Sequence, residues 1–188
     1  MSEPVASPIP CRSVLVLGGA RSGKSRYAQA LAESTNPHRL FLATAEAGDE
    51  EMSARIARHR ADRGQGWETR EEPLDLVGTL RAEARADRVV LVDCLTLWLS
   101  NLMFAERDLA AEVARLAAEI LDLQGPVVFV SNEVGRGVAP ATPLGRAFRD
   151  EQGRANQEIA AACGAVVFVT AGLPALIKPA PLPDLRLT

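Results

Sequence analysis

The clearest chemical pattern in the chain is the stretch Gly-Gly-Ala-Arg-Ser-Gly-Lys-Ser at residues 18–25. It matches G-x-x-x-x-G-K-[ST], in which glycines let consecutive backbone N–H groups curl around a phosphate. In this pattern the lysine ammonium reaches the outer phosphates, and the final hydroxyl binds a magnesium ion. We therefore predict a nucleotide-binding loop, with Lys24 acting in catalysis and Ser25 binding metal, made of Gly18, Gly19, Ala20, Arg21, Ser22, Gly23, Lys24 and Ser25.

A loop of this kind lies between a strand and a helix, because the helix N-terminus adds partial positive charge beside the phosphates. The apolar residues 13–17 precede the loop, and residues 26–33 read as helix. The alternative is a glycine-rich turn that matches by chance. We favour the phosphate-binding loop because both flanks and every fixed position agree.

A second candidate is Asp93, which ends the hydrophobic run Arg88-Val89-Val90-Leu91-Val92. An acid at the end of a buried strand is the pattern of the Walker-B aspartate, which helps to hold magnesium in phosphate-loop enzymes. The alternative is an aspartate that merely ends a strand. Beside the predicted phosphate loop, Asp93 is the candidate magnesium partner of Ser25.

Composition indicates one domain. The chain has 188 residues, 47% of them hydrophobic, a net charge of −3 and a pI near 5.5, so it has no basic field for nucleic acid. No apolar run is long enough for a membrane span, and the N-terminus lacks a signal-peptide core, so we expect a cytoplasmic protein. Three cysteines without metal-type spacing predict plain thiols.

The order of elements predicts an α/β fold. Strands are expected at 39–44, 88–93, 127–130 and 165–170, an edge strand at 67–70, and helices at 49–63, 74–85, 95–104, 108–123 and 144–163. Alternating strands and helices predict a doubly wound, mostly parallel sheet with helices on both faces, a RecA-like P-loop NTPase with nucleotide at the carboxyl edge. We expect a flexible leader at 1–12, a single catalytic domain at 13–178, and an irregular tail at 179–188, with prolines from Pro174 onward disrupting regular structure.

Several motifs in order make the chain resemble one family. These are the loop at 18–25, Ala43-Thr44-Ala45, the segment from Asp49 to Arg63, and Ser131-Asn132-Glu133-Val134-Gly135. Together they resemble the bifunctional adenosylcobinamide kinase / adenosylcobinamide-phosphate guanylyltransferase of cobalamin biosynthesis, over roughly residues 14–178. The ordered set is more specific than any one motif.

The resemblance implies two reactions that use ATP and GTP as substrates with Mg²⁺. The first phosphorylates the aminopropanol hydroxyl of adenosylcobinamide, and the second transfers GMP from GTP to adenosylcobinamide phosphate through a histidine-bound GMP. The matching histidine is His59. The resemblance also implies a homo-oligomer, a trimer in the family's usual assembly, and nucleotide contacts, beyond the loop, at Ala43, Thr44, Ala45, Arg60, Ala61, Asp62, Arg63, Glu71 and Asp93.

Residue chemistry supports two of these roles independently. A covalent guanylyl intermediate needs an unprotonated nucleophile near neutral pH, and His59 is flanked by arginines that favour the neutral ring. The alternative is a structural helical histidine. The Glu71 carboxylate matches the N1–H and 2-amino donors of guanine, which adenine lacks.

Other polar residues keep two interpretations. Glu133 either orients the substrate hydroxyl or is an ordinary loop carboxylate. Arg146, Arg149 and Arg154 either bind phosphate or form a solvated helix face.

Two rival functions remain open from the sequence alone. One is a phosphate-loop kinase for another small metabolite, without guanylyl transfer. The other is a non-catalytic nucleotide switch, although the guanine-reading Asn-Lys-x-Asp segment of regulatory GTPases is missing from the sequence. The phosphate loop alone does not separate these classes.

Overall fold

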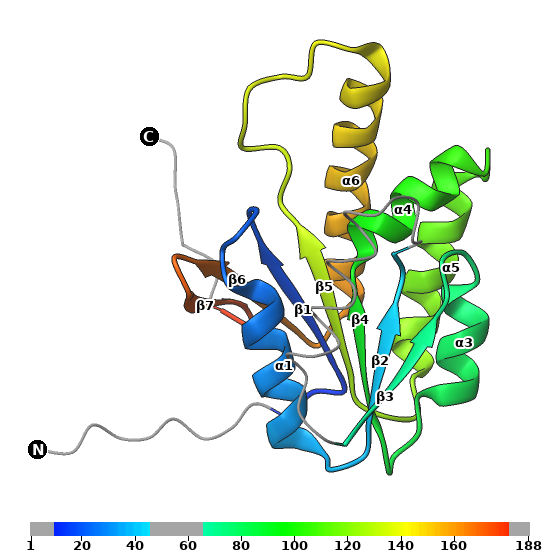
Figure 1. Cartoon of the computed structure of the whole chain (residues 1–188), viewed down its shortest axis with the longest axis vertical. Coiled ribbons are helices and arrows are strands. Elements are labelled where there is room, and N and C mark those ends of the chain that lie inside the picture. Colours follow the sequence, from blue (N-terminus) through cyan, green and yellow to red (C-terminus); the bar gives the residue numbers. More distant parts are fainter. Residues whose placement is uncertain (1–9, 46–65, 181–188) are drawn as a thin grey trace, which may run out of the picture.

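A computed structural model of the chain describes residues 10–45 and 66–180 (Figure 1). Seven strands in this part form one sheet in the order β3-β2-β4-β5-β1-β6-β7. The strands are β1 Ser13–Gly18, β2 Arg39–Ala43, β3 Trp67–Glu71, β4 Val89–Asp93, β5 Val127–Asn132, β6 Ala165–Thr170 and β7 Leu173–Lys178. The helices are α1 Lys24–Thr35, α3 Leu76–Glu83, α4 Leu95–Phe104, α5 Leu109–Asp122 and α6 Pro143–Ala162.

Helices cover both faces of the sheet, with α1 on one face and α3, α4, α5 and α6 on the other (Figure 1). Successive residues of each strand point to opposite faces. In β5, Val128 and Val130 pack with α1, whereas Val127 and Phe129 pack with the larger helical layer. Strands buried on both faces need continuous apolar runs, which is why the parallel strands were recognisable in the sequence.

All pairings are parallel except that between β6 and β7. The predicted fold class, a doubly wound and mostly parallel sheet with helices on both faces, is confirmed. The predicted edge strand is also present, as β3 pairs only with β2 at one end of the sheet. The domain boundaries at 1–12, 13–178 and 179–188 stay a prediction.

Side-chain caps fix the starts of three helices. Asp75, Asp108 and Thr142 each accept a hydrogen bond from the backbone N–H three residues further on, which satisfies a donor that has no partner within the helix. Pro143 follows Thr142 as the first residue of α6, where a missing N–H costs nothing. The expected helix at 144–163 therefore begins one residue earlier.

Three expectations about boundaries need correction. Strand β2 ends at Ala43, and β5 continues to Asn132, two residues beyond the apolar run that defined it in the sequence. The third concerns the end of the chain, where Pro174 led us to expect irregular structure but Leu173–Lys178 forms β7. The expected helix at 49–63 lies outside the described residues.

Strand β7 tolerates Pro174 because it is an edge strand, where a missing N–H need not break a ladder on both sides. Its last residue, Lys178, donates hydrogen bonds from Nζ to the carbonyl oxygens of Ala160, Ala161 and Cys163 at 2.9, 2.7 and 2.7 Å. These are carbonyls at the end of α6, which have no partner within the helix. The strand therefore also closes the end of α6.

None of the helices in the described ranges is long and apolar enough to cross a membrane. The three cysteines carry free thiols, as predicted, with Cys94 and Cys163 buried and Cys11 exposed.

Candidate nucleotide site

The predicted phosphate loop connects β1 to α1 at the carboxyl edge of the sheet. Gly23 caps α1 with φ of 94°, a left-handed conformation that favours glycine. A Cβ atom on Gly18 would lie 2.5 Å from the backbone oxygen of Val169, so only glycine fits there. The Lys24 ammonium donates to the Gly19 carbonyl oxygen at 3.1 Å, which holds it over the loop. The loop therefore has the strand, helix and glycine geometry that the motif requires.

The turn between β6 and β7 supports this loop, a contact that the sequence did not reveal. Gly172 donates its backbone N–H to the Ser22 carbonyl oxygen at 2.8 Å. A Cβ atom on Gly23 would lie 3.1 Å from the Gly172 Cα, and Gly172 itself has φ of 80°. Two glycines from distant parts of the chain therefore meet where the loop enters α1.

Strand register aligns the other predicted residues along the same edge. Glu71 pairs with Ala43, and Ala43 pairs with Asp93 on the next strand. Further along, Gly18 pairs with Asn132. By alternation from Trp67, Phe41 and Leu91, which all pack on the α1 side, the ends of β3, β2 and β4 present Glu71, Ala43 and Asp93 to that same side. Four strand spacings from β3 to β1 make about 19 Å.

The charges of Lys24 and Asp93 act on a common neighbour, the buried thiol of Cys94. Burial raises the pKa of Cys94 to about 11; the Asp93 carboxylate raises it further, and Lys24 lowers it. The two charged residues are therefore close enough to serve one site. Burial likewise raises the pKa of Cys163 to about 12, so neither buried thiol is a nucleophile near neutral pH.

Thr44 has a structural role that the sequence did not reveal. Its side chain is fully buried; Oγ1 donates to the Cys94 carbonyl oxygen at 2.7 Å and accepts from the Cys94 N–H at 2.9 Å. Asn101 donates to the Thr44 carbonyl oxygen at 2.7 Å. Thr44 thus joins the end of β2 to the segment that follows Asp93. Nucleotide contacts at Ala43, Thr44 and Ala45 stay a prediction.

The second histidine, His38, lies at the opposite edge from the phosphate loop. It directly precedes β2, its side chain is exposed, and its carbonyl oxygen accepts from the Val89 N–H at the start of β4. In a parallel sheet this is the amino edge, so His38 is remote from the loop. His59 and the predicted contacts Arg60, Ala61, Asp62 and Arg63 lie outside the described residues.

The polar residues with two interpretations make local contacts. The Glu133 carboxylate accepts from the Gly135 N–H at 2.8 Å within its own loop. Arg146 donates to the backbone oxygens of Pro140 and Ala141, while Arg149 and Arg154 pair with the neighbouring carboxylates of Asp150 and Glu151. These contacts fit a loop carboxylate and a solvated helix face.

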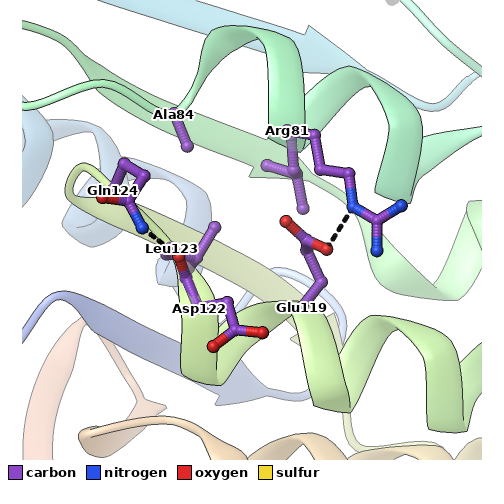
Figure 2. Close-up of a pocket in the computed structure, with 7 residues that line it drawn as sticks. Arg81, Ala84, Glu119, Asp122, Leu123 and Gln124 are labelled. Carbon is purple, nitrogen blue, oxygen red and sulfur yellow. Dashed lines mark hydrogen bonds and ion pairs between the residues drawn. The ribbon is translucent and has the colours of Figure 1, made fainter.

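Figure 2 shows a cavity of about 200 Å³ between α3 and the end of α5, with the Arg81–Glu119 ion pair beside it. The carbonyl oxygen of Leu123, which lines it, accepts from the guanidinium of Arg12 just before β1. The cavity is therefore near the amino edge of the sheet. None of the predicted nucleotide-site residues that the structure describes lines this cavity.

The sequence matches, over residues 14–177, the family described as cobinamide kinase / cobinamide phosphate guanyltransferase. It is 50% identical over 170 residues to the bifunctional adenosylcobalamin biosynthesis protein CobP of Pseudomonas aeruginosa, covering 89% of this chain and 98% of that protein. It is 39% identical over 180 residues to the bifunctional adenosylcobalamin biosynthesis proteins CobU of Escherichia coli and of Salmonella typhimurium, covering 88% of this chain and 99% of each.

Among solved structures, the chain is similar to the P4 protein from bacteriophage phi6 in complex with ADP, with a TM-score of 0.45 and 16% identity over 89% of this chain and 55% of that one. It is also similar to an isolated ATPase domain, with a TM-score of 0.46 and 12% identity over 84% and 68% of the two chains.

Proposed function

This chain belongs to the cobinamide kinase / cobinamide phosphate guanyltransferase family, and from that premise we propose that it carries out both reactions in adenosylcobalamin biosynthesis. The observation that carries the proposal is the match over 14–177, which includes the phosphate loop, both strand-end acids and the segment around His59. The substrates are adenosylcobinamide, adenosylcobinamide phosphate, ATP and GTP.

In the kinase step, the aminopropanol hydroxyl oxygen attacks the γ-phosphorus of the triphosphate, and the bond to the nucleoside diphosphate breaks. Such transfer depends on positioning and on neutralising the phosphate charge. The backbone N–H groups of the loop surround the phosphates, and Lys24 moves from the Gly19 carbonyl oxygen to the outer phosphates. No covalent enzyme intermediate is required for this step.

The donor set around the loop fits Mg²⁺, with the Ser25 hydroxyl and the Asp93 carboxylate as its protein ligands. The described residues contain no cluster of three or more His, Cys, Asp or Glu side chains that could hold a metal. Magnesium prefers this situation, since it is usually bound by one or two protein oxygens together with phosphates and water. When bound, it neutralises charge on the transferring phosphate.

In the guanylyl step, an imidazole nitrogen of His59 attacks the α-phosphorus of GTP, and pyrophosphate leaves. The phosphate oxygen of adenosylcobinamide phosphate then attacks the same phosphorus, which frees the histidine and gives adenosylcobinamide-GDP. Imidazole suits this role because it is unprotonated and nucleophilic near neutral pH. The position of His38 at the amino edge leaves His59 as the histidine for this step.

The remaining parts of the proposal concern recognition and assembly. Glu71 ends β3 on the α1 side with an exposed side chain, which suits hydrogen bonding to guanine. We propose a cytoplasmic homotrimer that does not act on nucleic acid. Exposed apolar side chains on the edge strand β7, Leu173, Leu176 and Ile177, suit a subunit interface.

Labelling with GTP tests the covalent step. Wild-type protein incubated with α-labelled GTP should retain an acid-labile label, and His59→Ala should retain none while keeping much of its cobinamide kinase activity. His38→Ala is the matched control and should label like wild type, because that side chain is exposed at the opposite edge. A labelled adduct on the His59→Ala protein would contradict the nucleophile assignment. A kinase without any labelling would favour the rival function.

A further inference from the structure

One strand separates the two nucleotide motifs. Strand β5 pairs with β1, which leads into the phosphate loop, and with β4, which ends at Asp93. Its last residue, Asn132, pairs with Gly18, and Asp93 pairs with Val130 two residues earlier. Asn132 therefore ends the strand between the loop and the aspartate, a position to which no role has been assigned above.

The pleat of β5 directs the Asn132 side chain to the nucleotide side. Val128 and Val130 pack in the cluster that includes Ala28 and Ala32 of α1, so the next residue of that series, Asn132, points to the α1 face. The intervening Ser131 points the other way and is bonded to α6. Asp93 is on the α1 face for the same reason. Asn132 is only partly buried, so its amide is accessible at the edge.

Hydrogen bonds from three elements hold the backbone on both sides of the Asn132 Cα (β1 and β5, Figure 1). Its N–H donates to the Thr96 Oγ1 at 2.9 Å, and its carbonyl oxygen accepts from the Asn156 Nδ2 at 3.0 Å. The next N–H, that of Glu133, donates to the Gly18 carbonyl oxygen at 3.1 Å. The end of β5 is thus fixed to α4, α6 and the start of the phosphate loop.

A buried polar network supports this strand end. Gln152 Nε2 donates to Ser131 Oγ and to Asn156 Oδ1, both at 3.0 Å, and Ser131 Oγ donates to Asn156 Oδ1 at 2.7 Å. The Gln152 Oε1 atom is buried without a hydrogen-bond partner in the described part of the chain, which costs stability. A network kept at such a cost beneath a strand end is typical of a functional position.

We propose that Asn132 is a further nucleotide contact, whose carboxamide NH₂ donates a hydrogen bond to an oxygen of the terminal phosphate. The inference rests on the proposed function only in taking a nucleoside triphosphate as substrate. The loop surrounds the inner phosphates, so the terminal phosphate emerges between the loop and Asp93, where β5 ends. Asn132 then stabilises charge on the phosphate as it is transferred, and its effect falls on the triphosphate rather than the diphosphate.

Asparagine suits this position better than an acid of the same shape. Its amide donates to phosphate without adding negative charge, whereas a carboxylate would repel the phosphate and attract the Lys24 ammonium away from it. The isosteric substitution Asn132→Asp therefore tests the contact without changing the volume of the side chain.

The test compares binding of a non-hydrolysable ATP analogue with binding of ADP, by titration in the presence of Mg²⁺. For Asn132→Ala we expect affinity for the analogue to fall about tenfold, with ADP affinity changed less than about twofold. For Asn132→Asp the loss for the analogue should be larger. Cobinamide kinase kcat should fall about 10²-fold in both variants.

Ser131→Ala is the matched control, because it alters the adjacent residue on the opposite face and weakens the network. It should lower the melting temperature while leaving the ratio of analogue to ADP affinity at the wild-type value. Parallel losses of analogue and ADP affinity in the Asn132 variants, or no loss in either, would overturn the proposal. Because these titrations need no cobinamide, the ratio stands or falls independently of the two proposed reactions.

Discussion

At the scale of single residues, Glu71 offers the sharpest test of base recognition. Its carboxylate is exposed at the end of β3, in register with Ala43 and, through it, with Asp93. Glu71→Gln replaces an acceptor for the two guanine donors with an amide that donates in part. GTP affinity should fall about tenfold, while ATP affinity changes less than about twofold, as measured by calorimetric titration. Equal losses for both nucleotides would remove Glu71 from base recognition.

Residues with a fixed motif were predictable, and residues that work through the fold were not. The loop and Asp93 were recognisable because their chemistry requires particular types at particular spacings. Thr44 and Asn132 carry no such pattern. Their partners Cys94, Asn101 and Asn156 are distant in sequence and meet them only through strand pairing.

At the scale of elements, the contact between β7 and α6 predicts a change in stability without a change in function. Lys178 neutralises the carbonyl end of α6, so Lys178→Met should lower the free energy of unfolding by about 1–2 kcal/mol and the melting temperature by roughly 2–8 °C. Lys178 pairs with Val166 near the amino edge of the sheet, so nucleotide affinity should be unchanged.

Lys178→Arg is the matched control for this element, since it keeps the cation and should lose less stability than Lys178→Met. Thermal unfolding followed by circular dichroism measures both variants. An unchanged melting temperature in Lys178→Met would mean that the ammonium does not stabilise the end of α6.

The parallel strands and most helices followed from local patterns, whereas β7 did not. Apolar runs mark strands covered on both sides, and caps such as Asp108 and Thr142 mark helix starts. Strand β7 is half exposed and contains Pro174, so it reads as irregular chain. Its pairing with β6 depends on a turn at Ala171 and Gly172, both with positive φ.

At the scale of the whole molecule, strand order explains how separate motifs form one site. Local patterns reveal the order of elements along the chain but not which strands are neighbours. Placing β5 between β1 and β4 aligns Glu71, Asp93 and Gly18 along one edge and inserts Asn132 between the two motifs. The function therefore depends on pairings between residues that are far apart in the chain.

The most direct test of the account follows both labels of the nucleotide into the corrinoid. Wild-type protein is incubated with adenosylcobinamide, Mg²⁺ and GTP labelled on either the α- or the γ-phosphate, with unlabelled ATP omitted and then added. The products are separated by chromatography, and the corrinoid is followed by its absorbance. Lys24→Ala is the control, since one loop holds the triphosphate in both steps and the variant should transfer neither label.

The account predicts that α-label from GTP appears in the corrinoid product, because GMP is transferred intact. When GTP is the phosphate donor, γ-label should also appear there, and added unlabelled ATP should dilute only the γ-label to the extent that ATP serves as donor. Corrinoid that gains γ-label but never α-label would contradict the bifunctional assignment and leave a kinase alone. Corrinoid that gains neither label would contradict the proposed function as a whole.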